Sequence, residues 1–171
     1  MENLVYAIVL LPLIGFVING LFGKRLPKAL VGGLATLVVF AAFLISVSIF
    51  IGFPADGTPV IVKAFEWFTI GGIQVNFGFQ IDQLSLMMMM IVTGIGSLIH
   101  LYSIGYMSHD KGFYKFFTYL NLFIFSMLLL VMGSNYLILF IGWEGVGLCS
   151  YLLIGFWYEN TEYGKAARKA F

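Results

Sequence analysis

Charged residues are scarce in this chain of 171 residues. Asp, Glu, Lys and Arg make up 10% of it, whereas apolar residues make up 61%, and the mean hydropathy is +1.00. This composition excludes an ordinary soluble domain and indicates an integral membrane protein in contact with the lipid bilayer. The net charge is only +1, so we expect no nucleic-acid partner.

Side chains that could hold a redox centre are scarcer still. Cys149 is the single cysteine, which excludes a disulfide framework and an intrinsic iron–sulfur cluster. His100 and His109 are nine residues apart, with His109 in a polar loop, so they cannot ligate one haem as a pair from facing helices. We therefore expect no cofactor in this chain, and any redox chemistry linked to it should take place on another chain.

Long apolar stretches dominate what is present. A membrane-spanning helix needs about 20 apolar residues. Residues 116–158 form a stretch of 43 with a single charge, which as one helix would measure about 65 Å, roughly twice the bilayer core. Gly133-Ser134-Asn135 should divide this stretch into two helices. We predict an all-α membrane protein with spans at residues 3–22, 29–53, 83–107, 113–132 and 135–158, plus the start of a sixth helix.

The basic residues predict the orientation of these spans. Eight of the nine lie in segments that fall on one side of the membrane, and only Lys63 falls on the other. The positive-inside bias makes the basic side cytoplasmic or matrix-facing, so the N-terminus should be outside. The eight are Lys24, Arg25, Lys28, Lys111, Lys115, Lys165, Arg168 and Lys169.

The external segment, residues 54–82, has its own pattern. Two arms, Val60–Ile70 and Ile73–Ile81, flank Gly71-Gly72, and the second arm alternates apolar and polar side chains. This pattern predicts an extracytoplasmic β-hairpin. The alternative is an irregular aromatic loop lying at the lipid headgroups.

Glu144 is the single charge in residues 116–158 and the first candidate for chemistry. It would lie about 14 Å into the fifth span, near the bilayer centre, where a carboxylate costs about 2.5 kcal/mol or more. Gly142, Gly145 and Gly147 surround it and would permit close approach of a neighbouring helix. We interpret Glu144 as a proton carrier. The structural alternative is a permanently protonated Glu144 that hydrogen-bonds to another helix.

Two weaker candidates accompany it. His100 shares one face of the third span with Thr93, Ser97 and Ser103, which could form part of a hydrated proton path, although such residues also simply pack and pair helices. Asp82 precedes the third span at its outer end. It is a good helix cap, and a role at a proton exit is the functional alternative.

Residues 142–156, Gly-Trp-Glu-Gly-Val-Gly-Leu-Cys-Ser-Tyr-Leu-Leu-Ile-Gly-Phe, closely resemble the signature of the largest antiporter-like subunit of respiratory complex I (NADH:quinone oxidoreductase, L-type). Supporting matches are Asp82–Leu86, Leu98–His100 and Leu120–Phe123. The same superfamily contains the large subunits of Mrp-type cation/proton antiporters and membrane-bound hydrogenases.

The resemblance implies that this is the N-terminal portion of a longer protein with two inverted five-helix repeats. Residues 1–112 would be the helices and hairpin before the first repeat, and residues 113–171 the first part of that repeat. It also implies that Glu144 pairs with a lysine on a later helix. Other membrane-arm subunits would be partners, and FMN, iron–sulfur clusters and quinone would belong to partner subunits.

The expected function is proton translocation across an energy-transducing membrane, as a subunit of NADH:quinone oxidoreductase. The bacterial inner membrane is preferred over the mitochondrial inner membrane as its location. One alternative is a subunit of an Mrp-type sodium/proton antiporter. A second is a structural membrane scaffold with no transport role.

Overall fold

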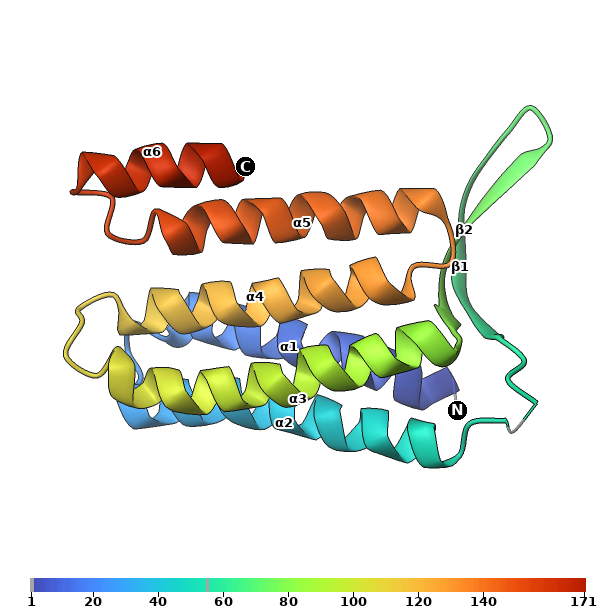
Figure 1. Ribbon diagram of the computed structural model, residues 1–171, viewed down its shortest axis with the longest axis horizontal. Coiled ribbons are helices and arrows are strands. Elements are labelled where there is room, and N and C mark those ends of the chain that lie inside the picture. Colours follow the sequence, from blue (N-terminus) through green and yellow to red (C-terminus); the bar gives the residue numbers. More distant parts are fainter. Residues whose placement is uncertain (1, 55) are drawn as a thin grey trace.

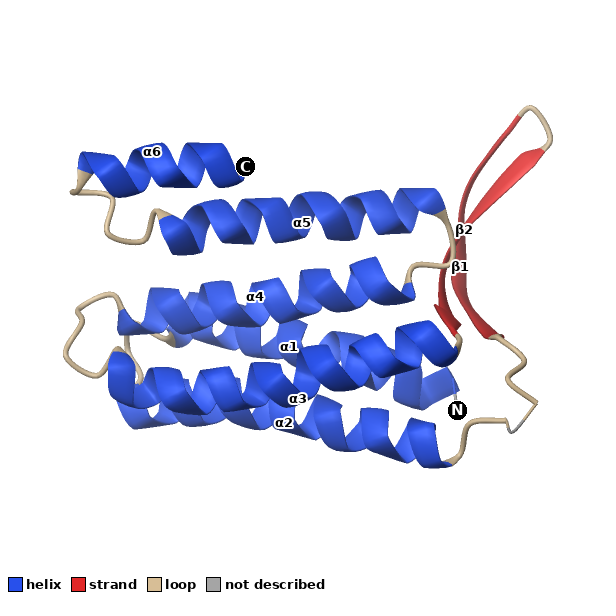
Figure 2. Cartoon of the chain, in the orientation of Figure 1, coloured by secondary structure: helices blue, strands red, loops and turns tan. Residues whose placement is uncertain are grey.

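The computed structural model describes residues 2–54 and 56–171. In this part of the chain six helices and one two-stranded sheet follow the predicted order (Figures 1 and 2). Five of the helices are long and apolar enough to cross a membrane, so the predicted architecture is confirmed. The helices are α1 (Glu2–Phe22), α2 (Lys28–Ile51), α3 (Gln83–Tyr106), α4 (Phe113–Met132), α5 (Tyr136–Ile154) and α6 (Thr161–Ala170), and the strands are β1 (Val60–Ile70) and β2 (Ile73–Ile81).

Helices α1 to α4 lie side by side as a bundle, α5 covers the outside of α4, and α6 folds back along α5 (Figure 1). Lipid offers apolar surface as good as a neighbouring helix, so membrane helices associate mainly through close packing. In this bundle small residues at the helix contacts allow such close packing. A Cβ added at Gly96 would lie 2.7 Å from Ile124 Cδ1, and one at Gly32 would lie 2.9 Å from Ile104 Cγ1.

The β-hairpin closes one end of the bundle, where the chain also crosses from α4 to α5 (Figure 1). Its strands are antiparallel, and Ile70 pairs with Ile73 across a turn in which Gly71 and Gly72 have φ of +56° and +86°. Two positive φ values in a two-residue loop favour glycine, because a Cβ is strained there. The predicted hairpin and its turn are confirmed.

Contacts with the helices hold the base of this hairpin. Phe79 forms a β-bridge with Gly133, and the Ser134 N–H donates to the Gly78 carbonyl at 3.2 Å. The Tyr6 hydroxyl donates to the Lys63 carbonyl at 2.9 Å. The hairpin is therefore anchored to α1 and to the turn that precedes α5.

One predicted boundary was wrong by four residues. We expected the fifth span to reach Tyr158, but α5 ends at Ile154 with Gly155 as its C-cap. Residues beyond Gly155 turn back toward the loop between α3 and α4, where the Trp157 Nε1–H donates to the Asp110 carboxylate at 2.9 Å. This long-range hydrogen bond links segments 47 residues apart, so the apolar pattern alone did not indicate it.

Candidate functional site

Glu144 is the ninth residue of α5, close to the middle of that helix. The helix begins where it does because Asn135 caps it: the Oδ1 atom accepts from the N–H groups of Leu137 and Ile138, each at 3.1 Å. The Asn135 amide in turn donates to the Asn76 carbonyl of the hairpin at 2.8 Å. The depth of Glu144 is thus set from the hairpin end of the bundle.

The glycines beside Glu144 let α5 lie directly against α4. A Cβ added at Gly142 would lie 2.6 Å from Leu130 Cα, closer than real side chains approach a backbone. A Cβ added at Gly145 would lie 2.6 Å from the Ser126 hydroxyl. The predicted close approach of a neighbouring helix is confirmed, and that neighbour is α4.

Glu144 itself points away from α4. Ile138, Gly142 and Cys149 are the buried residues of α5, and at about 100° per residue Glu144 lies roughly 140° around the helix from the face they share. Its side chain is exposed. Within residues 2–54 and 56–171 no hydrogen bond or ion pair involves it, and the one salt bridge there joins Lys165 and Glu162. The carboxylate therefore lies on an exposed helix face midway along α5.

His100 lies elsewhere, inside the α1–α4 bundle. It is 1% exposed and bonds to two oxygen atoms, with Nδ1 at 2.8 Å from the Gly96 carbonyl and Nε2 at 2.9 Å from Asn121 Oδ1. Asn121 belongs to α4, so the second of these bonds joins α3 to α4.

This pair has two alternative proton arrangements. Two facing oxygens suit an imidazolium, which has two N–H donors. A neutral ring has one N–H, and rotation of the Asn121 carboxamide by about 180° would then turn its NH₂ toward Nε2. The Nδ2 atom of Asn121 has no hydrogen-bond partner in the described part of the chain. The same is true of a second buried amide atom, Oδ1 of Asn19 on α1, which is not bonded to this pair. In either arrangement both ring nitrogens of His100 have a hydrogen-bond partner.

The other polar residues on the His100 face of α3 are buried as well. The Thr93 hydroxyl donates to the Met89 carbonyl at 2.6 Å, and the Ser97 hydroxyl donates to the Gly94 carbonyl at 2.7 Å. Both bonds stay within α3, which is the structural use of small hydroxyl residues in a membrane helix. Ser103 is also buried.

Asp82 caps α3 at the hairpin end of the bundle, as the sequence predicted. Its Oδ1 atom accepts from the Ser85 N–H at 2.8 Å, and the Ser85 hydroxyl accepts from the Asp82 N–H at 2.8 Å. The bond from the Ser85 N–H and a second one from the Gln80 amide hold the pKa of this carboxyl below its ordinary value. Asp82 is therefore a carboxylate bound into a capping box.

The three candidates do not form one site. Asp82 lies at the hairpin end, His100 lies inside the bundle, and Glu144 faces outward from α5. Among the described residues no group of three His, Cys, Asp or Glu side chains could hold a metal ion. Sequence reasoning missed Asn19, whose signal was a lone amide in an apolar span. It also missed a lysine-lined cavity at the opposite end of the bundle.

Known proteins resemble this chain along its whole length. The family model described as complex I, chain 5 N-terminus, matches residues 67–117. The model described as NADH:quinone oxidoreductase/Mrp antiporter, TM, matches residues 133–171. The chain is 46% identical to NADH-quinone oxidoreductase subunit L of Rickettsia felis over 99% of its length, and 48% identical to the protein of that name from Campylobacter jejuni over 100%. It spans 26% and 27% of these relatives.

Solved structures agree with this relationship. A chain of the Mrp complex from Dietzia sp. superposes with a TM-score of 0.70 and 26% identity, over 89% of this chain and 16% of that one. A chain of the archaeal membrane-bound sulfane sulfur reductase superposes with a TM-score of 0.82 over 97% of this chain and 33% of that one, and at 17% identity it shows the shared fold. The chain belongs to the NADH:quinone oxidoreductase/Mrp antiporter family of membrane proteins.

Proposed function

We propose that this chain is the N-terminal part of an L-type subunit of NADH:quinone oxidoreductase and that it takes part in proton translocation. The relatives named subunit L, at 46% and 48% identity, support this proposal, as do the two family models. In this role the chain contributes to an enzyme whose NADH oxidation and quinone reduction occur on other subunits. FMN, iron–sulfur clusters and quinone would bind to those subunits, and the direct partners would be other membrane-arm subunits.

Glu144 is the proposed proton carrier. The observation that carries this proposal is an exposed carboxylate at mid-span, on a helix held by glycine contacts with α4. A carboxylate facing lipid there would cost about 2.5 kcal/mol or more, so a protein partner or protonation must compensate for it. A lysine on a later helix, as the resemblance implies, would favour the charged form, and its withdrawal would favour proton uptake.

His100 is proposed as a separate proton relay inside the α1–α4 bundle. The two proton arrangements of the His100–Asn121 pair support the proposal, because both ring nitrogens of His100 keep a hydrogen-bond partner in each of them. Asp82 is a weaker candidate for the proton exit, since its oxygens are occupied by the cap of α3.

The membrane orientation belongs to the proposal as well. The basic segments between α1 and α2, between α3 and α4, and in α6 would face the cytoplasm, with the N-terminus and the hairpin outside. The bacterial inner membrane is the proposed location. Residues 1–112 would precede the first antiporter repeat, and residues 113–171 would open it.

The alternative is a subunit of an Mrp-type sodium/proton antiporter, which the likeness to the Mrp complex favours. Membrane vesicles that contain the full-length subunit separate the two functions. Transport that requires NADH supports the oxidoreductase, whereas transport driven by an imposed sodium or proton gradient without NADH supports the antiporter.

A Glu144→Gln substitution in the full-length subunit tests the carrier role. We expect NADH-driven proton pumping and quinone-linked turnover to collapse, while assembly on a native gel and reduction of an artificial acceptor persist. Glu162→Gln is the matched control, because it removes an exposed carboxylate in α6. Pumping by Glu144→Gln at the unmutated rate would show that Glu144 is structural and would favour the scaffold alternative.

A further inference from the structure

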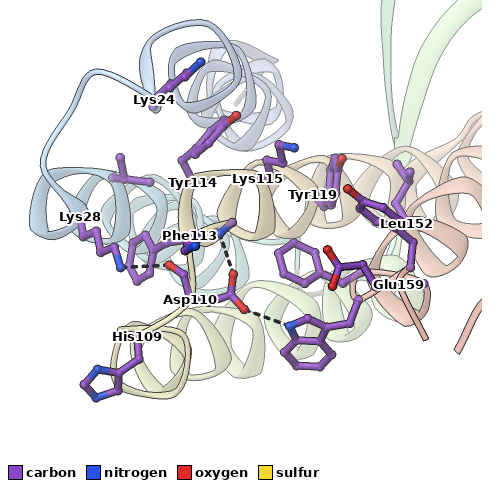
Figure 3. A pocket seen from close by; sticks show the side chains of 18 of the residues that line it. Lys24, Lys28, His109, Asp110, Phe113, Tyr114, Lys115, Tyr119, Leu152 and Glu159 are labelled. Carbon is purple, nitrogen blue, oxygen red and sulfur yellow. Dashed lines mark hydrogen bonds between the residues drawn. The ribbon is translucent and has the colours of Figure 1, made fainter.

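A cavity of about 960 Å³ opens at the end of the bundle opposite the hairpin. Three separate stretches of the chain enclose it: residues 23–31 around the turn between α1 and α2, residues 109–119 in the loop before α4 and its first turns, and residues 151–167 around the connection from α5 to α6 (Figure 3). It lies outside the sites considered above, since Glu144, His100 and Asp82 do not line it.

Lysine side chains dominate the charge of this cavity. Lys24, Lys28, Lys111 and Lys115 line it, against the carboxylates of Asp110 and Glu159. Lys28 is already hydrogen-bonded to the loop between α3 and α4, because its Nζ donates to the Ser108 and Asp110 carbonyls at 2.7 and 2.9 Å. In residues 2–54 and 56–171 the other three lysines form no salt bridge. Three exposed ammonium groups therefore face one cavity without an acidic partner.

One of the two acidic groups of the cavity, Asp110, is already hydrogen-bonded to neighbouring groups. The Asp110 carboxylate accepts from the Trp157 indole at 2.9 Å and from the Gly112 N–H at 2.6 Å (Figure 3). These bonds, the indole first, hold the pKa of Asp110 below its ordinary value. Asp110 thus fixes the loop against the α5–α6 connection and builds the wall of the cavity.

The remaining features of the cavity suit the boundary between membrane and water. Tyr114, Tyr119, Tyr151, Trp157 and Tyr158 line it, and such amphipathic rings gather at headgroup level. The adjacent N-terminus of α4 adds partial positive charge, and its N-cap, Gly112, has no side chain to accept from the first turn. Leu26, Leu152 and Phe156 make another part of the lining apolar.

We propose that this cavity binds the headgroup of an anionic glycerophospholipid, with its phosphate held among Lys24, Lys111 and Lys115. The lysines supply charge, the tyrosine hydroxyl groups supply donors for ester and glycerol oxygens, and the leucine and phenylalanine side chains accept the start of the acyl chains. A free phosphate would use only the lysines and would leave the apolar lining without a function. The proposal rests on the cavity and its charges and is independent of proton transfer at Glu144.

The test uses the intact membrane complex with the full-length subunit and a phosphatidylglycerol that carries a photoactivatable diazirine in one acyl chain. After illumination, labelling of α4 and α5 peptides is quantified by mass spectrometry, and unlabelled lipids compete. We expect phosphatidylglycerol to compete well, phosphatidylcholine at least tenfold less well, and inorganic phosphate not at all. The triple variant Lys24→Gln/Lys111→Gln/Lys115→Gln should bind the probe about a hundredfold more weakly, at about fivefold per lysine.

The matched control is Arg25→Gln/Arg168→Gln/Lys169→Gln, which removes three exposed positive charges that do not line the cavity. It should stay within twofold of the unmutated complex. Equal competition by phosphatidylcholine, competition by inorganic phosphate, or equal loss in both triple variants would overturn the proposal. If the cavity variant fails to assemble, Lys24→Gln and Lys115→Gln are tested singly, and unchanged binding in both would overturn it as well.

Discussion

Alanine at Gly142 should push α5 away from α4. The added Cβ would lie 2.6 Å from Leu130 Cα and 2.9 Å from Leu130 Cβ, whereas ordinary contact begins at 3.4 Å. The obstacle is backbone, so no side-chain rotation relieves it, and α5 must withdraw by roughly 0.8 Å or more. Because Glu144 is two residues further along this helix, the same movement displaces the proposed proton carrier.

The size of the effect follows from two opposing contributions. Alanine is about 1 kcal/mol better than glycine inside a helix, whereas overpacking of this kind costs about 1–3 kcal/mol. Gly164 in α6 isolates the first contribution, since a Cβ added there meets no atom within 4 Å in the described structure. Gly142→Ala should therefore be about 1–3 kcal/mol less stable than Gly164→Ala.

The assay is thermal loss of the intact complex, followed on native gels, together with NADH-driven pumping below the transition. Gly142→Ala should lower the midpoint temperature of this thermal loss relative to Gly164→Ala, and it should reduce proton pumping. Gly145→Ala provides an internal check, because its obstacle is the Ser126 side chain, and the double variant Gly145→Ala/Ser126→Gly should recover the unmutated midpoint. A Gly142→Ala complex as stable and active as Gly164→Ala would refute the packing argument.

Two further predictions concern the polar groups of α3. Asp82→Ala should cost about 1 kcal/mol through loss of the cap, whereas Asp82→Asn should cost little, as measured by thermal loss at pH 7. Hydrogen bonds hold the Asp82 pKa below its ordinary value. The stability that its charge contributes to the folded state is therefore fully present above about pH 3.9 and is lost as the pH falls through the lower folded-state pKa. Asn121→Leu should lower the stability of the folded state by about 0.6–1.7 kcal/mol, because it removes the hydrogen bond to His100. If the pair is coupled, adding His100→Phe to that variant should cost less than His100→Phe does alone, and strictly additive losses would contradict the pairing.

Local patterns predicted the elements well, for a physical reason. A bilayer requires about 20 apolar residues per span, and it requires backbone polar groups to bond within the helix, so composition alone marks the spans. The breaker at Gly133-Ser134-Asn135, the cap at Asp82 and the Gly71-Gly72 turn act through neighbours a few residues away. The end of α5 was missed because the apolar stretch continues to Tyr158, whereas the residues beyond Gly155 bond to the loop before α4 through Trp157 and Asp110, which are far apart in the sequence.

The amino-acid sequence by itself determined that the chain forms helices long and apolar enough to span a membrane, that a hairpin joins the second and third of them, and that a carboxylate lies midway along the fifth, because hydropathy and turn chemistry act over short distances. Only the tertiary structure decided which way that carboxylate points, since the contacts of Gly142 and Gly145 with α4 turn Glu144 to the open face of α5. It likewise paired His100 with Asn121 and brought lysines from residues 24–28 and 111–115 around one cavity. Those features depend on packing between residues distant in the sequence, which no local pattern records.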